Sequence, residues 1–444
     1  MERMSSFCAI FMLVFALFTA TAFAQDPADR LNTLKDTMKK QGTLLEEQQK
    51  TIDALRREID SRPASQAARS AAPSPGASGL FGGSSLTNPN ISVLLNTFVY
   101  GSNLDNNELE QRGIPGFTTN GLERRYGFNV DSAELFIFSP VDPYFNFYTN
   151  IPVTADGAEL EEAYVVTTAL PAGWQIKGGK FKSNFSRLDA QHPHAWDFAD
   201  IALPYRAFLG DEGLGGEMGA QLTWLPALPV YTLIGAEVMQ GDNDLLFGAD
   251  AQEGPHAFSF FVKSSFDTSD NSTFYFGPSM LFGKTSSTSI LPDRSVIGKS
   301  ALYGMELVWK WKPTSRKSLT LQSEYLHLVQ TGDATDQATE AVDSLERRQD
   351  GIYVQAIYRV YRWGIGARWE MLDLFNDSFK RAGVERESGD KPSRATGSLE
   401  FIPSEFSRIR LQYTNDRSAP DGRENNEVIA QFIFGIGAHA AHPF

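Results

Sequence analysis

The chain has 444 residues, of which 12% are aromatic and 21% are charged, and its formal net charge is −14 at pH 7. The acidic balance disfavours a nucleic-acid binder, and the slightly negative mean hydropathy disfavours a bundle of membrane helices. The single cysteine, Cys8, lies in the N-terminal apolar segment, so the remaining chain has no disulfide framework, zinc–thiolate site or cysteine nucleophile. Two classes remain: a soluble β-rich protein, and a membrane β-barrel whose apolar residues are diluted by alternation.

Residues 1–24 have the pattern of a secretory signal peptide. Arg3 supplies a positive charge, the stretch from Ile10 to Phe18 is apolar, and the stretch from Ala22 to Ala24 matches a small-x-small cleavage site. A membrane anchor is the alternative, but the apolar stretch is shorter than the roughly 20 residues that a spanning helix needs. We therefore expect export, with Gln25 as the new N-terminus.

Residues 25–60 predict a coiled-coil stalk in the periplasm. Two series of mostly apolar residues recur every seven positions and lie three positions apart, as in the seam of a coiled coil. The two series are Leu31, Met38, Leu45, Ile52 and Ile59, and Leu34, Gln41, Gln48 and Leu55. A lone amphipathic helix packed on a domain is the alternative, but no apolar stripe exists beyond the seam. The stalk predicts an oligomer.

Residues 61–90 predict a flexible linker, because most of this segment is rich in Ala, Ser, Pro and Gly. Residues 25–86 together carry nine basic and eight acidic side chains. The acidic excess of the chain therefore belongs to the region that follows.

Residues 91–444 predict a transmembrane β-barrel, because apolar and polar residues alternate in short segments throughout. Between Trp363 and Met371, for example, Ile365 and Trp369 lie on one face, and Arg368 lies on the other. The predicted strands are 91–100, 127–138, 143–151, 159–169, 173–182, 215–225, 229–240, 255–266, 271–284, 298–312, 317–330, 349–361, 363–373, 394–403, 405–416 and 425–436. The fold class is thus an all-β membrane protein, an antiparallel barrel of about 16 strands with an N-terminal coiled-coil helix.

The connections between these segments alternate between short turns and long loops. The long loops are 101–126, 183–214, 241–254, 285–297, 331–348, 374–393 and 417–424. Barrels of the outer membrane have short periplasmic turns and longer outer loops. A soluble all-β protein is the alternative, but its core would have to pair the full charges on the polar faces at high cost. A water-filled lumen would solvate those charges.

Sixteen strands leave an aqueous channel rather than a packed interior. The longest loop, 183–214, follows the fifth predicted strand, the position from which general porins fold a loop into the barrel to form the constriction. Charged rings at a constriction are a common means of selectivity. The candidate constriction residues are Lys177, Lys180, Lys182, Arg187, Asp189, Asp197, Asp200, Arg206, Asp211 and Glu212.

The strand before this loop has a parity conflict. Lys177 falls on the lumen side, but Lys180 and Lys182 fall on the lipid side. We predict a β-bulge at Gly178 and Gly179 that returns both lysines to the lumen. The alternative is that these lysines already lie above the membrane, where parity has little effect.

Several charged residues elsewhere have lumen parity. The predicted wall residues are Glu217, Glu237, Glu306, Arg359, Arg368, Glu370, Arg408 and Arg410. Acidic and basic groups on different walls would create a transverse field that orients polar solutes. An equally good interpretation is that mixed charges only keep the lumen hydrated.

His192 and His194 are the candidate metal ligands, because imidazole is a common ligand and the two residues share a face if the chain is extended. Asp189 and Asp197 are the nearest acidic residues, but the spacing fixes no third ligand. The alternative is that these are solvated loop histidines.

The chain resembles the outer-membrane porin superfamily that includes the phosphate-selective and related specific porins. The resemblance rests on the leader, the stalk, the sixteen-strand pattern, the hairpin from Glu134 to Phe145, the segment from Gly178 to Phe185, and Phe444. A terminal aromatic residue on an amphipathic last strand looks like the signal that the outer-membrane assembly machinery reads. Such porins are trimers, so the resemblance implies a homotrimer held by the stalk and the barrel.

Two segments, His192 to Phe198 and Gly437 to Phe444, resemble a subgroup labelled as zinc-linked outer-membrane receptors. An energy-coupled receptor needs about 22 strands and a plug, so the implied zinc role is that of a channel. Phosphate-selective porins use ladders of lumen arginine and lysine, whereas this barrel is acidic, and we therefore do not transfer that selectivity.

We predict a porin of the bacterial outer membrane that passes small hydrophilic solutes by diffusion, with no enzymatic step and no cofactor. Its partners are those solutes, outer-membrane lipid and copies of itself, without nucleic acid. A substrate-specific channel for a metal ion, a chelate or another small ligand is the first alternative. A barrel hydrolase and a soluble secreted protein that binds sugars are the others.

Overall fold

The computed structural model describes the greater part of the predicted barrel region. The described residues are 89–114, 116–118, 121, 124–248, 254–291, 293–385, 391–419 and 422–437. The predicted signal peptide, the stalk, nearly all of the linker and Phe444 lie outside these residues, so they stay predictions.

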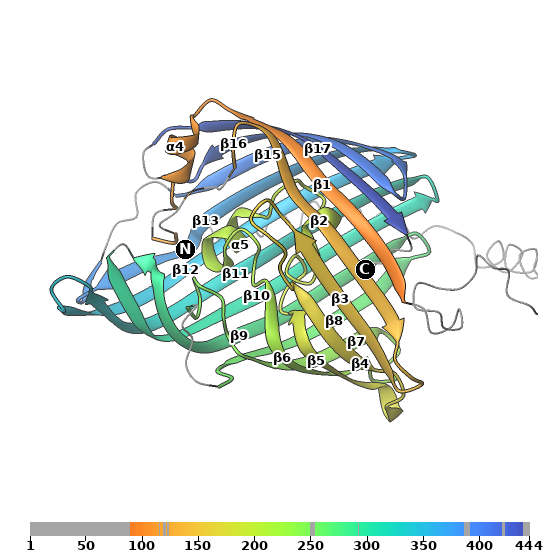
Figure 1. The fold of residues 1–444 in the computed structure, drawn as a ribbon, viewed down its shortest axis with the longest axis horizontal. Coiled ribbons are helices and arrows are strands. Elements are labelled where there is room, and N and C mark those ends of the chain that lie inside the picture. The colour runs from red at the N-terminus through yellow and green to blue at the C-terminus, as the bar shows by residue number, and fades with distance from the viewer. Residues whose placement is uncertain are drawn as a thin grey trace, which may run out of the picture. The chain divides into compact units, whose positions relative to one another are not determined.

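Sixteen of the described strands form one closed antiparallel barrel (Figure 1). Each of these strands pairs with the next one along the chain. The first strand, β1 (Asn90–Ser102), pairs on one side with β2 (Gly127–Pro140) and on the other with the last strand, β17 (Asn425–Gly437). This pairing closes the sheet into a barrel, so neither the first nor the last strand is left as a free edge, and the prediction of a barrel with about sixteen strands is confirmed.

The remaining elements lie between β2 and β17. The other strands of the wall are β3 (Phe145–Val153), β4 (Glu162–Thr167), β5 (Trp174–Lys182), β6 (Gly216–Trp224), β7 (Tyr231–Met239), β8 (Ala257–Ser269), β9 (Ser272–Leu291), β10 (Arg294–Thr314), β11 (Lys317–Asp336), β12 (Val342–Val360), β13 (Trp363–Arg381), β15 (Ser393–Ser404) and β16 (Ser407–Arg417). A two-residue strand, β14 (Val384–Glu385), pairs only with the end of β13. The short helices are α4 (Asn106–Glu110), which lies between β1 and β2, η1 (Pro171–Gly173), η2 (Pro193–Ala195) and α5 (Leu203–Leu209).

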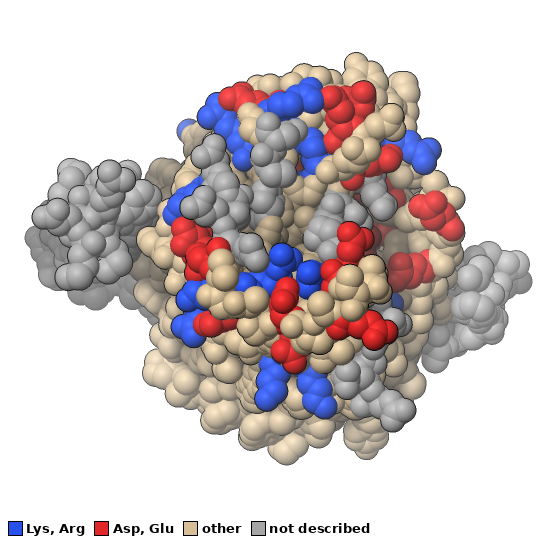
Figure 2. Space-filling view, turned by 90° about the vertical axis from the view of Figure 1, so that its left-hand side faces the viewer, with Lys and Arg blue, Asp and Glu red and all other residues tan. Residues whose placement is uncertain are grey.

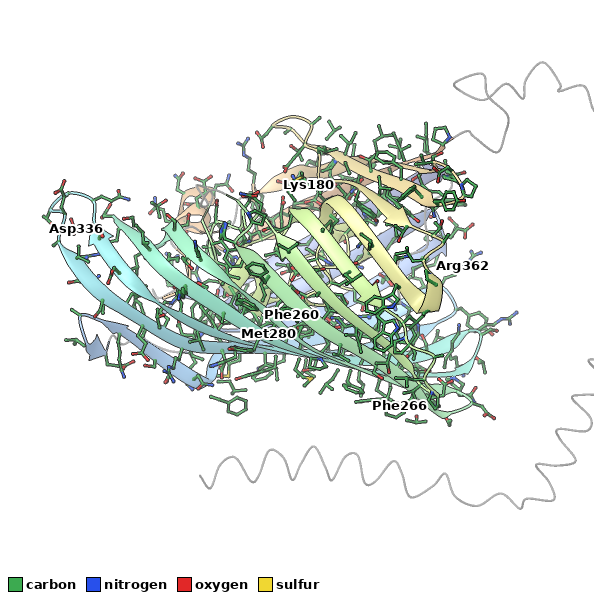
Figure 3. The ribbon with its side chains drawn as sticks, turned by 90° about the horizontal axis from the view of Figure 1, so that it is seen from below. Lys180, Phe260, Phe266, Met280, Asp336 and Arg362 are labelled. Atoms are coloured by element: carbon green, nitrogen blue, oxygen red, sulfur yellow. The ribbon has the colours of Figure 1, made fainter. Side chains whose placement is uncertain are left out.

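The strands from β9 to β13 are much longer than the predicted segments, with 19 to 21 residues each. They continue through much of the segments 285–297, 331–348 and 374–393, so the prediction of long loops there was wrong. Figure 3 shows the two ends of this wall, with Asp336 at the end of the long strands and Arg362 at a tight turn at the other end. Beyond the membrane no strand face contacts lipid, and the few buried apolar residues there, such as Ile290, Val296 and Leu345, do not continue the regular alternation that reveals a strand.

The outer surface of the barrel is apolar. Phe260 and Met280 are opposite each other on β8 and β9, point outward in Figure 3, and are 47% and 36% exposed. Other exposed outward residues include Leu222, Ile234, Phe258, Tyr303, Met305, Val354, Ile365, Trp369, Leu399, Leu411, Val428 and Phe434. A continuous apolar surface of this kind requires a lipid environment. Within the described residues, no helix is long and apolar enough to cross a membrane.

One apolar cluster lies inside the barrel, where the sequence predicts only an aqueous lumen. It joins residues of the loop 183–214, hereafter the inward loop, to lumen-facing residues of the wall and to Ile114, Phe117 and Phe247 from two other loops. Its larger members are Ile114, Phe117, Phe185, Trp196, Leu203, Tyr205, Phe208, Met239, Phe247, Leu281, Leu302, Leu326, Leu328, Tyr353 and Leu372. The interior is therefore partly packed, and the inward loop is held there by burial of apolar surface.

The predicted bulge in β5 is absent. The ladders from β5 to β4 and from β5 to β6 run without a register shift through Gly178 and Gly179. Instead, Gly179 has a φ of +132°, and a Cβ there would lie 2.3 Å from the carbonyl oxygen of Ala163. Only glycine accommodates this backbone. The local twist is therefore absorbed by one glycine rather than by an extra residue.

Candidate functional site

The inward loop begins with polar contacts to the barrel wall. The hydroxyl of Ser183 donates to Glu237 Oε2 at 2.5 Å, and the backbone N–H of Asn184 donates to Glu237 Oε1 at 2.9 Å. Gln221 Nε2 also donates to Glu237 at 2.7 Å. Glu237, a predicted wall residue, therefore holds the start of the inward loop against β7.

Asp189 ties the two arms of the inward loop together. Its carboxylate accepts hydrogen bonds from the Ser186 hydroxyl at 2.6 Å and from the Leu214 N–H at 2.9 Å. The side chain is buried, and burial raises the pKa of Asp189 to about 6, against the lowering effect of these hydrogen bonds. Asp189 is therefore a residue of loop structure and contacts no lumen solvent.

Helix α5 carries the centre of the inward loop, and all seven of its residues are buried. Its first turn has no capping side chain of its own; the wall residue Glu370 accepts a hydrogen bond from the Leu203 N–H at 2.6 Å. Tyr205 donates its hydroxyl to Glu324 on β11 at 2.5 Å, and Tyr353 on β12 donates to the same carboxylate. Wall carboxylates thus satisfy the polar groups that the helix buries.

The segment that precedes α5 is held by arginines from the late strands. Asp197 lies 2.8 Å from Arg359 Nη2, and Asp200 lies 2.9 Å from Arg368 Nη2 and contacts Arg394 as well. Burial opposes ionisation of Asp200, but the two arginines outweigh it and hold its pKa below the ordinary range. The sequence analysis did not identify Arg394, although its lumen parity on β15 could have indicated it.

Two further predicted wall arginines, both on β16, support the inward loop. Arg408 Nη1 donates to the carbonyl oxygens of His194 and Trp196 at 3.0 and 3.2 Å, and Arg410 Nη2 donates to Trp196 at 2.8 Å. Both guanidinium groups also contact Glu400, at 3.2 and 2.9 Å. Backbone carbonyls that face the lumen are thereby paired with charged donors.

The remaining predicted residues lie on the wall, at the ends of the inward loop or, in the case of Arg206, in α5. Lys177 lies 5.1 Å from the ring centroids of both Tyr164 and Phe181. Glu217 accepts hydrogen bonds from the Gly241 and Asp242 N–H groups, and Glu306 pairs with Lys263. Arg187 donates to Gln322, Arg206 pairs with Asp211, and Lys180 pairs with Glu159. Glu212 is exposed. The predicted constriction residues are therefore dispersed rather than arranged in one ring.

The predicted transverse field is only partly matched by this arrangement. The arginines do come from β12 to β16, and Glu217, Glu237 and Glu306 come from β6, β7 and β10. Asp197 and Asp200 of the inward loop, however, pair with these arginines. Arg359, Arg408 and Asp197 keep side-chain exposures of 29%, 23% and 23%, so solvent inside the barrel reaches these three charges.

The mouth at the end of the long strands carries both signs of charge. Figure 2 shows Lys and Arg side chains interspersed with Asp and Glu around this end of the barrel. Neither sign dominates the described part of the rim in that view.

A compact polar cluster joins η2 to the early strands, and we call it the His192 cluster. It consists of Glu134, Asn150, Glu161, Glu162, Lys182, His192 and His194. His194 Nδ1 lies 2.9 Å from Glu134 Oε1, and His192 Nε2 lies 2.9 Å from Glu162 Oε2. Lys182 Nζ lies 2.8 Å from Glu161 Oε1. The cluster is largely buried, with only its Glu161 and His192 side chains more than a tenth exposed.

The cluster brings together ligand types that can hold a metal ion. One ligand atom each of Glu134, His192 and His194 lie within 4.8 Å of one another. Burial lowers the pKa of His192, but hydrogen bonds with the three carboxylates of the cluster outweigh burial and hold it well above the ordinary value. The acidic residue beside the two histidines is Glu134. It is neither Asp189 nor Asp197, which are near the histidines in the sequence. Lumen parity of Glu134 on β2 was the available signal.

No family model matches the chain. It is 38% identical over 381 residues to an uncharacterized protein of Aquifex aeolicus (strain VF5), a match that covers 80% of each chain. The chain therefore belongs to the same family as that protein.

Solved structures show the same fold at low identity. An anion-selective porin from Comamonas acidovorans has a TM-score of 0.51 and 9% identity, over 79% of this chain and 100% of the porin. The outer-membrane channel DcaP of Acinetobacter baumannii has a TM-score of 0.50 and 12% identity, over 79% and 97%. The architecture is thus that of outer-membrane porins.

Proposed function

We propose that this chain, as a member of the family of the A. aeolicus protein, is an outer-membrane porin through which small hydrophilic solutes diffuse passively, with no enzymatic step. The observation that carries the proposal is the inward loop, which lies inside a closed barrel beside solvent-accessible charges. Arg359, Arg408 and Asp197 are those charges. The porin and channel neighbours share this architecture, which supports a channel but does not identify the solute.

Reconstitution in a planar lipid bilayer tests the proposal. The full-length protein should produce discrete conductance steps, and heating should shift its mobility on a gel, as expected of a folded outer-membrane barrel. Recovery in the outer-membrane fraction should accompany both results. A soluble monomer without channel activity would contradict the proposal.

A homotrimer is part of the same proposal. The heptad pattern over residues 31–59 favours an oligomer, and a barrel surface that is apolar on its outer face can pack against another copy as well as against lipid. Chemical cross-linking in native membranes, read out by mass, should yield species up to three chains. Deletion of residues 25–60 should weaken this assembly. If the intact chain gives no cross-linked dimers or trimers, the homotrimer is contradicted.

A metal-specific channel is the second candidate, favoured by one observation. The Glu134, His192 and His194 ligand atoms are close together beside the lumen. Conductance measured with added zinc compares the two candidates. A porin without metal preference should show the same current with and without zinc, whereas a metal-specific channel should show saturable block or transport at low zinc concentration.

A further inference from the structure

The His192 cluster has an excess of buried negative charge. Three carboxylates, Glu134, Glu161 and Glu162, face one ammonium group, that of Lys182. Glu134, Glu162 and Lys182 are between 4% and 7% exposed. Buried carboxylates are costly unless a cation compensates them. A proton on His192 offsets part of this charge, and one divalent cation bound to the imidazole nitrogens would replace that proton.

Asn150 joins two of these carboxylates to His192. Asn150 is 1% exposed, and its Nδ2 lies 3.2 Å from Glu134 Oε2, 2.7 Å from Glu161 Oε2 and 2.9 Å from His192 Nδ1. Its two N–H donors serve the two carboxylates, while His192 Nδ1 donates or accepts according to its protonation. Its own Oδ1 is buried without a hydrogen-bond partner among the described residues.

Glu162 orients His192 in the manner of a metal ligand. A carboxylate only accepts hydrogen bonds when it is ionised, so the 2.9 Å contact means that His192 Nε2 carries the proton. His192 Nδ1, which lies 3.6 and 3.3 Å from Glu134 and Glu161, is the nitrogen that a metal ion would occupy in place of a proton. Metal-bound histidines almost always donate their second N–H to a carboxylate or a carbonyl in this way.

We propose that Glu134, His192 and His194 bind one divalent transition-metal cation inside the barrel, with Glu161 as an adjacent oxygen ligand and Glu162 as the positioning residue of His192. Two imidazoles with carboxylates favour zinc-like cations over calcium or magnesium, which prefer oxygen ligands alone. This inference deepens the proposed channel by naming a cation that the inward loop can hold.

The binding test uses Co²⁺ as a spectroscopic probe and Zn²⁺ as its competitor. The full-length protein, purified in detergent without a histidine tag, is titrated with Co²⁺ and followed by visible absorption. Because His439 and His442 could also bind metal, the same titration is made in a His439→Gln/His442→Gln background. We expect one Co²⁺ per chain with a low-symmetry spectrum that Zn²⁺ abolishes, in both backgrounds.

Variants connect the signal to the site. Glu134→Gln and His194→Gln should weaken Co²⁺ binding by about 100-fold or more, and Glu162→Gln should weaken it by about 10- to 100-fold, the effect typical of an outer partner. His327→Gln is the matched control, because His327 stacks on Tyr303 on the outer face of the barrel and should bind Co²⁺ like the wild type. Heat-shifted gel mobility verifies that each variant is folded.

Three results would overturn the site. The first is no binding of Co²⁺ or Zn²⁺ at 1 mM. The second is binding that the His439→Gln/His442→Gln substitutions abolish, and the third is binding that Glu134→Gln and His194→Gln leave unchanged. Bilayer conductance of the same preparation separates this failure from failure of the channel. A conducting barrel without Co²⁺ binding refutes only the metal site. A barrel that binds Co²⁺ but carries no current refutes the porin and leaves the site standing.

Discussion

Asp200 and Arg368 join the inward loop to β13, with 2.9 Å between Asp200 Oδ1 and Arg368 Nη2. Arg394 contacts the other oxygen of the same carboxylate, and the Arg368 guanidinium lies over the Phe198 ring at 4.5 Å. One loop carboxylate thus receives two buried guanidinium groups from two different strands. The position of the inward loop inside the barrel depends on this group of contacts.

The variant Asp200→Ala should loosen the inward loop. Removing one partner of a buried ion pair costs about 3 kcal/mol, and Arg368 and Arg394 would keep, among carboxylates, only their longer contacts with Glu370 and Asp416. We expect larger open-channel current fluctuations in a bilayer than in the wild type. Asp211→Ala is the control. Asp211 pairs with Arg206 but is already 46% exposed, so solvent screens this ion pair. Equal noise in the two variants would contradict the role of Asp200.

The variant Tyr205→Phe should weaken the attachment of α5 to β11. It removes the hydroxyl that donates to Glu324, and the loss of a hydrogen bond to a buried carboxylate costs about 2 kcal/mol. Amide hydrogen exchange in Leu203–Leu209 should become faster. Tyr358→Phe, on the outer face where Tyr358 is 42% exposed, should leave exchange unchanged, and faster exchange in both variants would point to a general loss of barrel stability instead.

Ion selectivity should respond to the solvent-accessible charges beside the inward loop. Replacing Arg359 and Arg408 by Gln removes two positive charges from the lumen and should raise the preference for K⁺ over Cl⁻. Asp197→Asn should lower that preference. Reversal potentials of single channels in a KCl gradient measure both changes. The acidic barrel predicts at most a cation bias in the wild type. If the reversal potential shifts in the same direction in both variants, these residues act only through the position of the inward loop.

Attachment of the inward loop should weaken as the pH rises from about 4 to about 6. Burial raises the pKa of Asp189 from 3.8 to about 6, so the folded loop holds a proton more tightly than the unfolded loop does. The stabilisation is complete below the unfolded pKa and is lost as the pH rises through the folded one, at a cost of about 3 kcal/mol.

Hydrogen exchange of residues 186–214, corrected for the intrinsic pH dependence, should therefore report more opening at pH 7 than at pH 4. Asp189→Asn keeps an acceptor for the Leu214 N–H but cannot titrate, and its corrected exchange should be independent of pH in this range. A pH profile in the variant that matches the wild type would exclude Asp189 as the cause.

The strands could be predicted from the sequence wherever one face met lipid and the other met water. Trp363, Ile365 and Trp369 face outward and Arg368 faces inward, so period-two alternation located β13. The same reasoning failed in the distal parts of β9 to β13, where Lys284 and the serines and threonines after it give no apolar face. Beyond the bilayer, backbone pairing rather than patterning determines the strand.

The candidate site was harder to predict because its parts are distant in the sequence. His192 and His194 were identified as a pair, but Glu134 and Asn150 reach them from β2 and β3 through barrel curvature and loop folding. The apolar interior was missed for a related reason. Leu302 and Leu326 have lumen parity, yet only the entry of the inward loop into the barrel shows what they contact.

The seam between β1 and β17 has a kinetic consequence. Asn96 and Gln431 hydrogen-bond across this seam at 3.0 Å although they are 335 positions apart in the chain. The barrel therefore cannot close before nearly all of its strands have been synthesised and delivered. Until then β1 exposes an unpaired edge that can recruit foreign strands, and pairing at such sequence distance is intrinsically slow. Maturation of this protein should therefore depend on helpers that shield β1 until β17 arrives.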